Sequence, residues 1–140
     1  MMENKVFLDT AFVIALISQT DKYHQVALQL SEQLTLSRTQ IVTTRAIIFE
    51  IGNALSKQQY RTKAIHFLKL LESDPQIEIV PITEELYVKA FNLFSSHHDK
   101  SWGLVDCLSF VVMRQRDIIS ALTTDHHFQQ AGFRALLLEP

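Results

Sequence analysis

Cysteine is nearly absent from this chain of 140 residues, in which Cys107 stands alone. A single cysteine cannot form an internal disulfide, so the sequence lacks the disulfide framework of a small secreted protein. Its first residues also lack the charged start, apolar stretch and small-residue cleavage site of a secretory signal. We therefore expect a cytoplasmic protein.

Glycine is scarce too, and its three positions, Gly52, Gly103 and Gly132, are far apart. Neither the dinucleotide-binding fingerprint nor the phosphate-binding P-loop can be built from glycines spaced in this way. The sequence therefore excludes a nucleotide cofactor held by either motif.

Long apolar runs and an excess of basic charge are missing as well. No uncharged apolar stretch approaches the roughly 20 residues that a membrane-spanning helix needs. The net charge of −2 argues against a protein that coats nucleic acid by bulk electrostatics. Any nucleic-acid contact must be local, and its candidate cations, on helix faces that are more often only solvated, are Arg45, Lys57, Arg61, Lys63, Arg114 and Arg116.

Hydrophobic residues make up 47% of the chain, enough for one substantial core, so we expect residues 1–140 to form a single domain. Short apolar runs predict strands at 5–8, 41–42, 77–80, 121–123 and 135–138. Apolar residues at helical spacing predict helices at 11–17, 24–36, 45–56, 62–72, 83–94 and 104–116. This alternation predicts an α/β fold, a three-layer α/β/α sandwich with a central, mainly parallel sheet.

Two aspartates, Asp9 and Asp125, each follow a predicted strand and precede a helix. This places both at the carboxyl ends of strands, where open α/β sheets bind their ligands. Aspartate is also a preferred helix N-cap, so either residue alone is more often structural than functional.

Two further acids, Glu50 and Asp106, lie within predicted helices. Glu50 has an ordinary alternative, the solvated stripe of an amphipathic helix. Asp106 is harder to explain in that way, because its helix is apolar on nearly every side and only Ser109 offers a polar neighbour one turn on. An unpaired buried carboxylate is strongly destabilising, so we expect Asp106 to face a polar cleft or an ion.

Together, these four carboxylates can converge at one end of a parallel sheet. They would repel one another and raise their own pKa values unless a cation neutralised them. Ligation by oxygen alone suits Mg²⁺ or Mn²⁺ rather than Zn²⁺. Such ions activate water and stabilise charge on a phosphoryl group, which is the chemistry of phosphodiester hydrolysis.

Four motifs occur in an order that resembles the PIN-domain family, particularly the toxin ribonucleases of VapC-type toxin–antitoxin pairs. They are Phe7-Leu8-Asp9-Thr10, Glu50-Ile51-Gly52-Asn53, the stretch from Asp99 to Cys107 and the stretch from Leu122 to Phe128. The resemblance covers the length of the chain. It implies that Asp9, Glu50, Asp106 and Asp125 ligate Mg²⁺ or Mn²⁺ in a nuclease that hydrolyses RNA, whether tRNA, rRNA or mRNA. It also implies a homodimer and a small inhibitory antitoxin.

Several neighbours of the four acids have polar side chains that suit a supporting role, namely Thr10, Asn53 and Thr123. One departure from the family is Val105, because the residue before Asp106 is often Ser or Thr there. Lys100 and Trp102 precede Asp106 in a polar loop, where the lysine can meet a phosphate and the tryptophan can stack on a base. Trp102 more often packs as core, and His126 is a further candidate for substrate contact.

Histidine offers a different interpretation, since His97-His98-Asp99 and His126-His127 could supply zinc ligands or a general base. No metal or nucleophile motif accompanies them, so we favour the carboxylates. Cys107 lies in an apolar helix and is expected to be core. The alternatives to a toxin ribonuclease are a processing nuclease without an antitoxin and a non-catalytic binding module of the same fold.

Overall fold

The central sheet of the computed structural model is parallel throughout. The structure describes residues 4–140, and in them five strands pair in the order β3-β2-β1-β4-β5. The strands are β1 (Lys5–Leu8), β2 (Gln40–Thr44), β3 (Ile77–Val80), β4 (Ser120–Leu122) and β5 (Arg134–Ala135). The α/β fold and the sheet that the sequence predicts are thereby confirmed.

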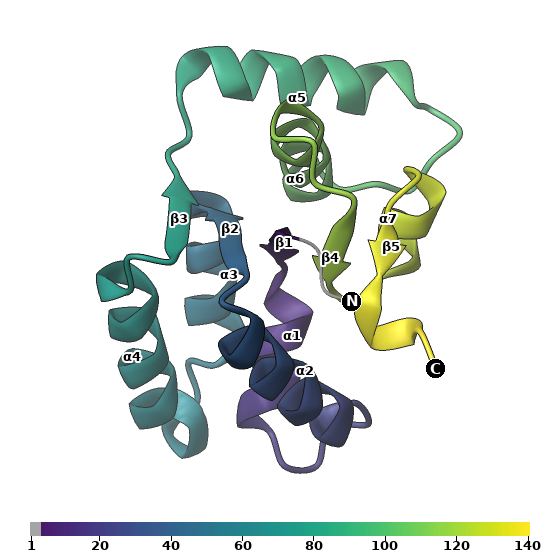
Figure 1. Cartoon of the computed structure of the whole chain (residues 1–140). Coiled ribbons are helices and arrows are strands. Elements are labelled where there is room, and N and C mark those ends of the chain that lie inside the picture. Colours follow the sequence, from purple (N-terminus) through teal and green to yellow (C-terminus); the bar gives the residue numbers. More distant parts are fainter. Residues whose placement is uncertain (1–3) are drawn as a thin grey trace.

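Seven α-helices flank this sheet in the described chain. They are α1 (Thr10–Ile17), α2 (His24–Ser37), α3 (Arg45–Ala54), α4 (Gln58–Ser73), α5 (Glu84–Ser96), α6 (Leu104–Gln115) and α7 (His126–Gln130). Helices α1 to α4 pack against one another, and α5 packs against α6 as a separate pair (Figure 1). None of the helices in residues 4–140 has the length and apolarity needed to cross a membrane.

The order of the strands explains where the helices lie. From β1 the chain moves outward to β2 and β3, and it then returns past β1 to β4 and β5. Crossovers between parallel strands are right-handed in almost every protein, so a reversal of direction moves the connecting helices to the opposite face. The neighbours β1 and β4 therefore flank a topological switch point, the place where open α/β sheets form a ligand crevice at their carboxyl ends.

The core is continuous across both faces of the sheet. Val6, Phe7 and Leu8 of β1 are all buried, as expected for a central parallel strand that helices cover on both sides. Phe110 of α6 meets Phe128 of α7 edge-on, with ring centroids 5.0 Å apart, and Phe128 in turn contacts Phe7. Cys107 is fully buried in this core, as the sequence predicts.

Two element boundaries differ from the sequence prediction by more than two residues. Helix α4 begins at Gln58 rather than near Thr62, because Lys57 already has the extended backbone of an N-cap. The last predicted strand, 135–138, is wrong beyond Ala135, since Leu136–Leu138 forms a 3-10 helix. Leu136 and Leu137 are buried in this conformation, and a short apolar run does not by itself distinguish a strand from a helical turn.

Candidate active site

The four carboxylates come from four elements that meet at the carboxyl edge of the sheet. Asp9 follows β1 and Asp125 follows β4, the two strands at the switch point. Glu50 lies on α3, which continues directly from β2, and Asp106 lies in the first turn of α6. The convergence that the sequence predicts is a consequence of this topology.

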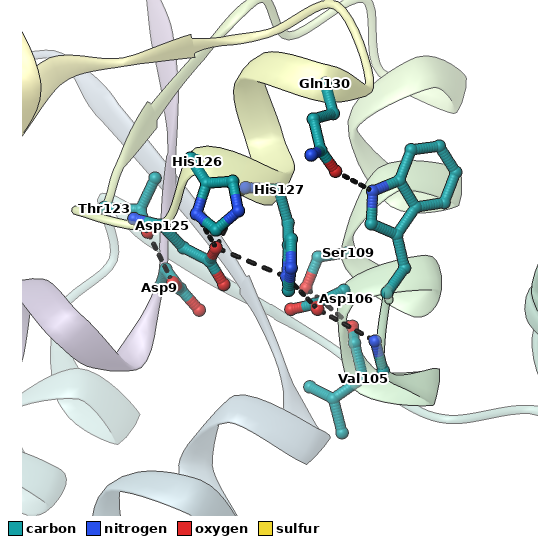
Figure 2. A network of polar contacts seen from close by, with 11 residues as sticks. Asp9, Val105, Asp106, Ser109, Thr123, Asp125, His126, His127 and Gln130 are labelled. Atoms are coloured by element: carbon teal, nitrogen blue, oxygen red, sulfur yellow. Dashed lines mark hydrogen bonds and ion pairs between the residues drawn. The ribbon is translucent and has the colours of Figure 1, made fainter. Parts of the chain in front are cut away.

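Asp9 and Asp125 are joined through one buried hydroxyl group. The Thr123 hydroxyl donates to Asp9 Oδ2 at 2.7 Å and accepts the backbone N–H of Asp125 at 3.0 Å (Figure 2). Although Asp9 is the N-cap residue of α1, its side chain makes no capping hydrogen bond. Asp125 does cap α7, since its Oδ1 accepts the His127 N–H at 2.9 Å. Helix capping thus accounts in part for the presence of Asp125 and does not account for Asp9.

Glu50 is held toward the same place by the neighbour of Asp9. The Thr10 hydroxyl donates to Glu50 Oε1 at 2.8 Å, which joins the start of α1 to the middle of α3. The hydroxyls of Thr10 and Thr123 are therefore hydrogen-bonded to two of the four carboxylates, Glu50 and Asp9.

Asp106 is satisfied by a backbone amide and by a histidine. Its Oδ2 accepts the N–H of Gly103 at 3.0 Å and lies 3.2 Å from His127 Nδ1. The same imidazole nitrogen lies 3.3 Å from Asp125 Oδ1, so the His127 ring stands between the two carboxylates (Figure 2). Asp106 faces a polar site, as predicted, and Ser109 turns away to bond the Val105 carbonyl at 3.0 Å.

The electrostatics of the cluster are those of acids held close together. Burial raises the pKa of Asp9 from an ordinary 3.8 to about 6, and the like charges of Glu50 and Asp106 act in the same direction. The hydrogen bond from Thr123 opposes this shift without cancelling it. Ionised Asp9 is thus destabilised in the protein alone, and a divalent cation would relieve that cost.

The donor set fits a divalent ion. In residues 4–140, the partners of these carboxylates are hydroxyls, backbone amides and histidine rings rather than lysine or arginine. Acidic oxygens that no permanent cation neutralises, one of them with a raised pKa, are suitable ligands for Mg²⁺ or Mn²⁺. His127 adds a nitrogen beside them, which the expectation of an all-oxygen site did not include.

Of the other candidate residues, some lie on the exposed surface around the four acids, here called the rim, and one is buried in the core. His126 lies beside the cluster with its side chain 68% exposed, Lys100 pairs with Asp99 at 3.3 Å, and Asn53 is exposed on α3. In the described part of the chain, neither Lys100 nor Asn53 is hydrogen-bonded to the four acids. Trp102 is only 7% exposed.

The surroundings of Trp102 favour packing over base stacking. Its Nε1 donates to Gln130 Oε1 at 3.0 Å, and its ring meets Phe110 edge-on at a centroid distance of 5.1 Å. Both contacts tie the loop before α6 to the rest of the core. A base can stack only on an exposed ring face, so of the two roles open to Trp102 the structural one fits this geometry.

His127 is the residue to which sequence analysis gave no part in the carboxylate site, although it weighed His126-His127 as zinc ligands or a general base. Sequence analysis named His126 as a candidate for substrate contact, whereas the structure brings His127, half-buried, against Asp106 and Asp125. A signal was present, because an aspartate that caps a helix bonds the N–H two or three residues on and so holds that residue beside its own carboxylate. Sequence analysis named Asp125 as a possible cap, and following that cap to the N–H it binds would have pointed to residue 127.

Comparisons with known proteins find the same fold in other chains. VapC20 of Mycobacterium tuberculosis, a 23S rRNA-specific endonuclease, is 27% identical over 129 residues, in an alignment that covers 91% of this chain and 95% of the relative. Its crystal structure, described as that of a sarcin-ricin loop cleaving toxin, has a TM-score of 0.78 at 25% identity and again covers 91% and 95%. FitAcB from Neisseria gonorrhoeae shares the fold, with a TM-score of 0.64 at 16% identity over 93% of this chain and 94% of that one. The PIN domain profile matches residues 6–134, and the chain therefore belongs to the PIN domain family.

Proposed function

We propose that residues 1–140 form a single PIN-type nuclease domain, a Mg²⁺- or Mn²⁺-dependent endoribonuclease whose active site is Asp9, Glu50, Asp106 and Asp125. The observation that carries the proposal is the linkage of these four acids at the switch point of the sheet. Hydrogen bonds join Glu50 to the start of α1, Asp9 to Thr123, and Asp106 through His127 to Asp125. Helix capping accounts in part for Asp106 and Asp125 but not for Asp9 or Glu50, whereas a bound cation would use all four acids.

Each residue of the site then has a task. The four carboxylates hold the cation, which supplies an activated water and charge stabilisation for phosphodiester hydrolysis. Thr10 and Thr123 keep Glu50 and Asp9 in position by their hydroxyl hydrogen bonds. On the exposed rim, His126, Lys100 and Asn53 are available to contact the RNA. This local arrangement suits a chain whose net charge of −2 does not attract RNA as a whole.

The similarity to VapC20 supports a more specific proposal for the substrate and partner of this chain. That relative is a toxin that cleaves 23S rRNA at the sarcin-ricin loop, so ribosomal RNA is the first substrate to test, ahead of tRNA and mRNA. The same similarity supports a toxin with a small antitoxin partner, and the family resemblance supports a homodimer. A cytoplasmic location is part of the same proposal, because ribosomes lie in the cytoplasm.

The test is cleavage of a labelled transcript that carries the sarcin-ricin loop, with tRNAs and an unstructured RNA in parallel. Protein is assayed with Mg²⁺, with Mn²⁺ and with EDTA. We expect cleavage that needs the metal and falls at least 100-fold in Asp106→Asn, because a site ligand is lost. The matched control is Asp117→Asn, which removes the same charge at the other end of α6, where the positive φ of 53° also suits asparagine.

The outcomes separate the candidate functions. Metal-dependent cleavage lost in Asp106→Asn and kept in Asp117→Asn supports the nuclease. Equal activity in both variants would mean that the cleavage comes from a contaminant or from another site. If RNA is bound and no RNA is cut by folded protein free of inhibitor, a binding module becomes the better description. Co-expression with the protein encoded next door, and recovery of a stable inhibitory complex, separates a toxin from a processing nuclease.

A further inference from the structure

Beside the four-carboxylate site, the start of α7 gathers a second group of metal-ligating atoms. Asp125, His126 and His127 each offer one ligand atom, and these atoms all lie within 4.8 Å of one another. Among residues 4–140, no other group of three His, Cys, Asp or Glu side chains has its ligand atoms this close together. We propose that these three residues form a binding site for a Zn²⁺-like transition ion, distinct in chemistry from the Mg²⁺ or Mn²⁺ site that shares Asp125.

The geometry needs little change to accept such an ion. Both imidazoles direct Nδ1 toward Asp125 Oδ1, from 3.8 Å for His126 and from 3.3 Å for His127. Two ligands that each lie about 2.1 Å from one tetrahedral zinc ion are about 3.4 Å apart. The His127 separation of 3.3 Å meets this spacing, and the His126 separation of 3.8 Å is slightly longer. His126 is the most exposed of the three, so rotation of its side chain can close the gap.

Two of the three ligands are already held in place. The Asp125 carboxylate accepts the His127 N–H at 2.9 Å, and its backbone N–H bonds the buried Thr123 hydroxyl at 3.0 Å. The His127 ring is only 20% exposed. A site in which most ligands are held before binding loses less conformational entropy when the ion arrives.

The chemistry of the donors selects the ion. Two imidazole nitrogens and one carboxylate suit Zn²⁺, Ni²⁺ or Cu²⁺, whereas Mg²⁺ prefers oxygen ligands and retains its waters. For a given set of nitrogen and oxygen ligands, affinity also rises along the first-row ions and exceeds that for Mn²⁺. The site therefore discriminates against the ions that we assign to the hydrolytic centre.

Sharing Asp125 has a functional consequence that rests on the proposed nuclease activity. An ion bound by His126 and His127 draws Asp125 away from the hydrolytic cation and draws His127 away from Asp106. Micromolar Zn²⁺ should then inhibit cleavage that Mn²⁺ supports. The binding site itself does not depend on that activity.

Calorimetric titration of the full chain with Zn²⁺ at pH 7.5, without RNA, tests the site directly. We expect one Zn²⁺ per chain in the wild type and an affinity about tenfold or more lower in His126→Ala. His127→Ala should lose at least as much, and circular dichroism checks its fold. If that variant fails to fold, the exposed His126 still decides the question. Titration with Mg²⁺ should be unchanged in His126→Ala.

The chain provides its own matched control in His97-His98-Asp99, which has the same composition without the clustering. His97 Nδ1 is engaged by the Leu93 carbonyl at 3.0 Å. His98→Ala should therefore bind Zn²⁺ like the wild type. The proposal is overturned if His126→Ala binds Zn²⁺ as tightly as the wild type, or if His98→Ala loses affinity to the same extent.

The inhibition is measured separately, as the fraction of each variant's own Mn²⁺-supported cleavage that remains with Zn²⁺ present. Wild type and His98→Ala should be inhibited alike, and His126→Ala should be resistant. If no RNA is cleaved at all, the proposed function fails while the calorimetry still decides the metal site. Tight Zn²⁺ binding without inhibition would leave the site in place and overturn its effect on the hydrolytic centre.

Discussion

Burial and the neighbouring acids disfavour the ionised form of Asp9 in the folded protein. Its folded pKa of about 6 lies above the ordinary 3.8, so the folded protein binds the proton more tightly than the unfolded chain does. The resulting stability is complete below pH 3.8 and is lost as the pH rises through 6. In metal-free protein the loss is of the order of 1 to 3 kcal/mol.

Asp9→Asn should remove this loss, because the amide stays neutral and its oxygen can still accept the Thr123 hydroxyl. In EDTA at pH 8 we expect a higher free energy of unfolding than in the wild type, by roughly 1 to 3 kcal/mol, with the difference vanishing near pH 4. Urea denaturation across this pH range measures it. Asp117→Asn is the control. Parallel pH profiles for wild type and Asp9→Asn would contradict the assignment.

At the scale of an element, helix α3 shows how the position of a site carboxylate depends on the way its helix begins. It carries Glu50 and begins at the buried N-cap Thr44, whose Oγ1 accepts the Ile47 N–H at 3.3 Å. Helix α5 has an equivalent cap in Thr83, which accepts the Leu86 N–H at 3.1 Å. Of these two helices, only α3 supplies a site carboxylate.

Thr44→Ala and Thr83→Ala form a matched pair. Each should lower the free energy of unfolding by about 1 kcal/mol, the usual value of an N-cap. Thr44→Ala alone should also weaken Mn²⁺ binding several-fold, because Glu50 is then less firmly positioned. Urea unfolding and calorimetry give the two quantities. Equal Mn²⁺ affinity in the two variants would show that the cap does not position Glu50.

At the scale of the whole molecule, the cation should stabilise the fold, since its proposed ligands come from two strand ends and two helices. At free Mn²⁺ of 100 times the dissociation constant, binding contributes about 2.7 kcal/mol. For a chain of this size that corresponds to a rise in Tm of roughly 5 to 10 °C. EDTA should reverse the shift, and Asp106→Asn should reduce it in a thermal-denaturation series. Identical shifts in the wild type and Asp106→Asn would argue against the site.

Much of this molecule could be predicted because its signals are local. Apolar runs and helical spacing depend on neighbours within a few residues, so β1, β3 and helices such as α6 lie close to where the sequence indicates. Asp106 was predicted to face a polar site for the same reason, as an acid among apolar neighbours. Weak or ambiguous local signals produced the errors, as at the start of α4 and in the last three leucines.

The sequence by itself thus determined the α/β class, the family motifs and the four acids. Only the tertiary structure decided the order of the strands, the burial of Trp102 and the place of His127. The physical reason is the separation of the partners along the chain. The hydroxyl of Thr123 meets Asp9 across 114 residues and that of Thr10 meets Glu50 across 40, so no short pattern records either pair. Such contacts depend on the strand order, in which the chain returns past β1 to form β4. The packing of the whole chain determines that order.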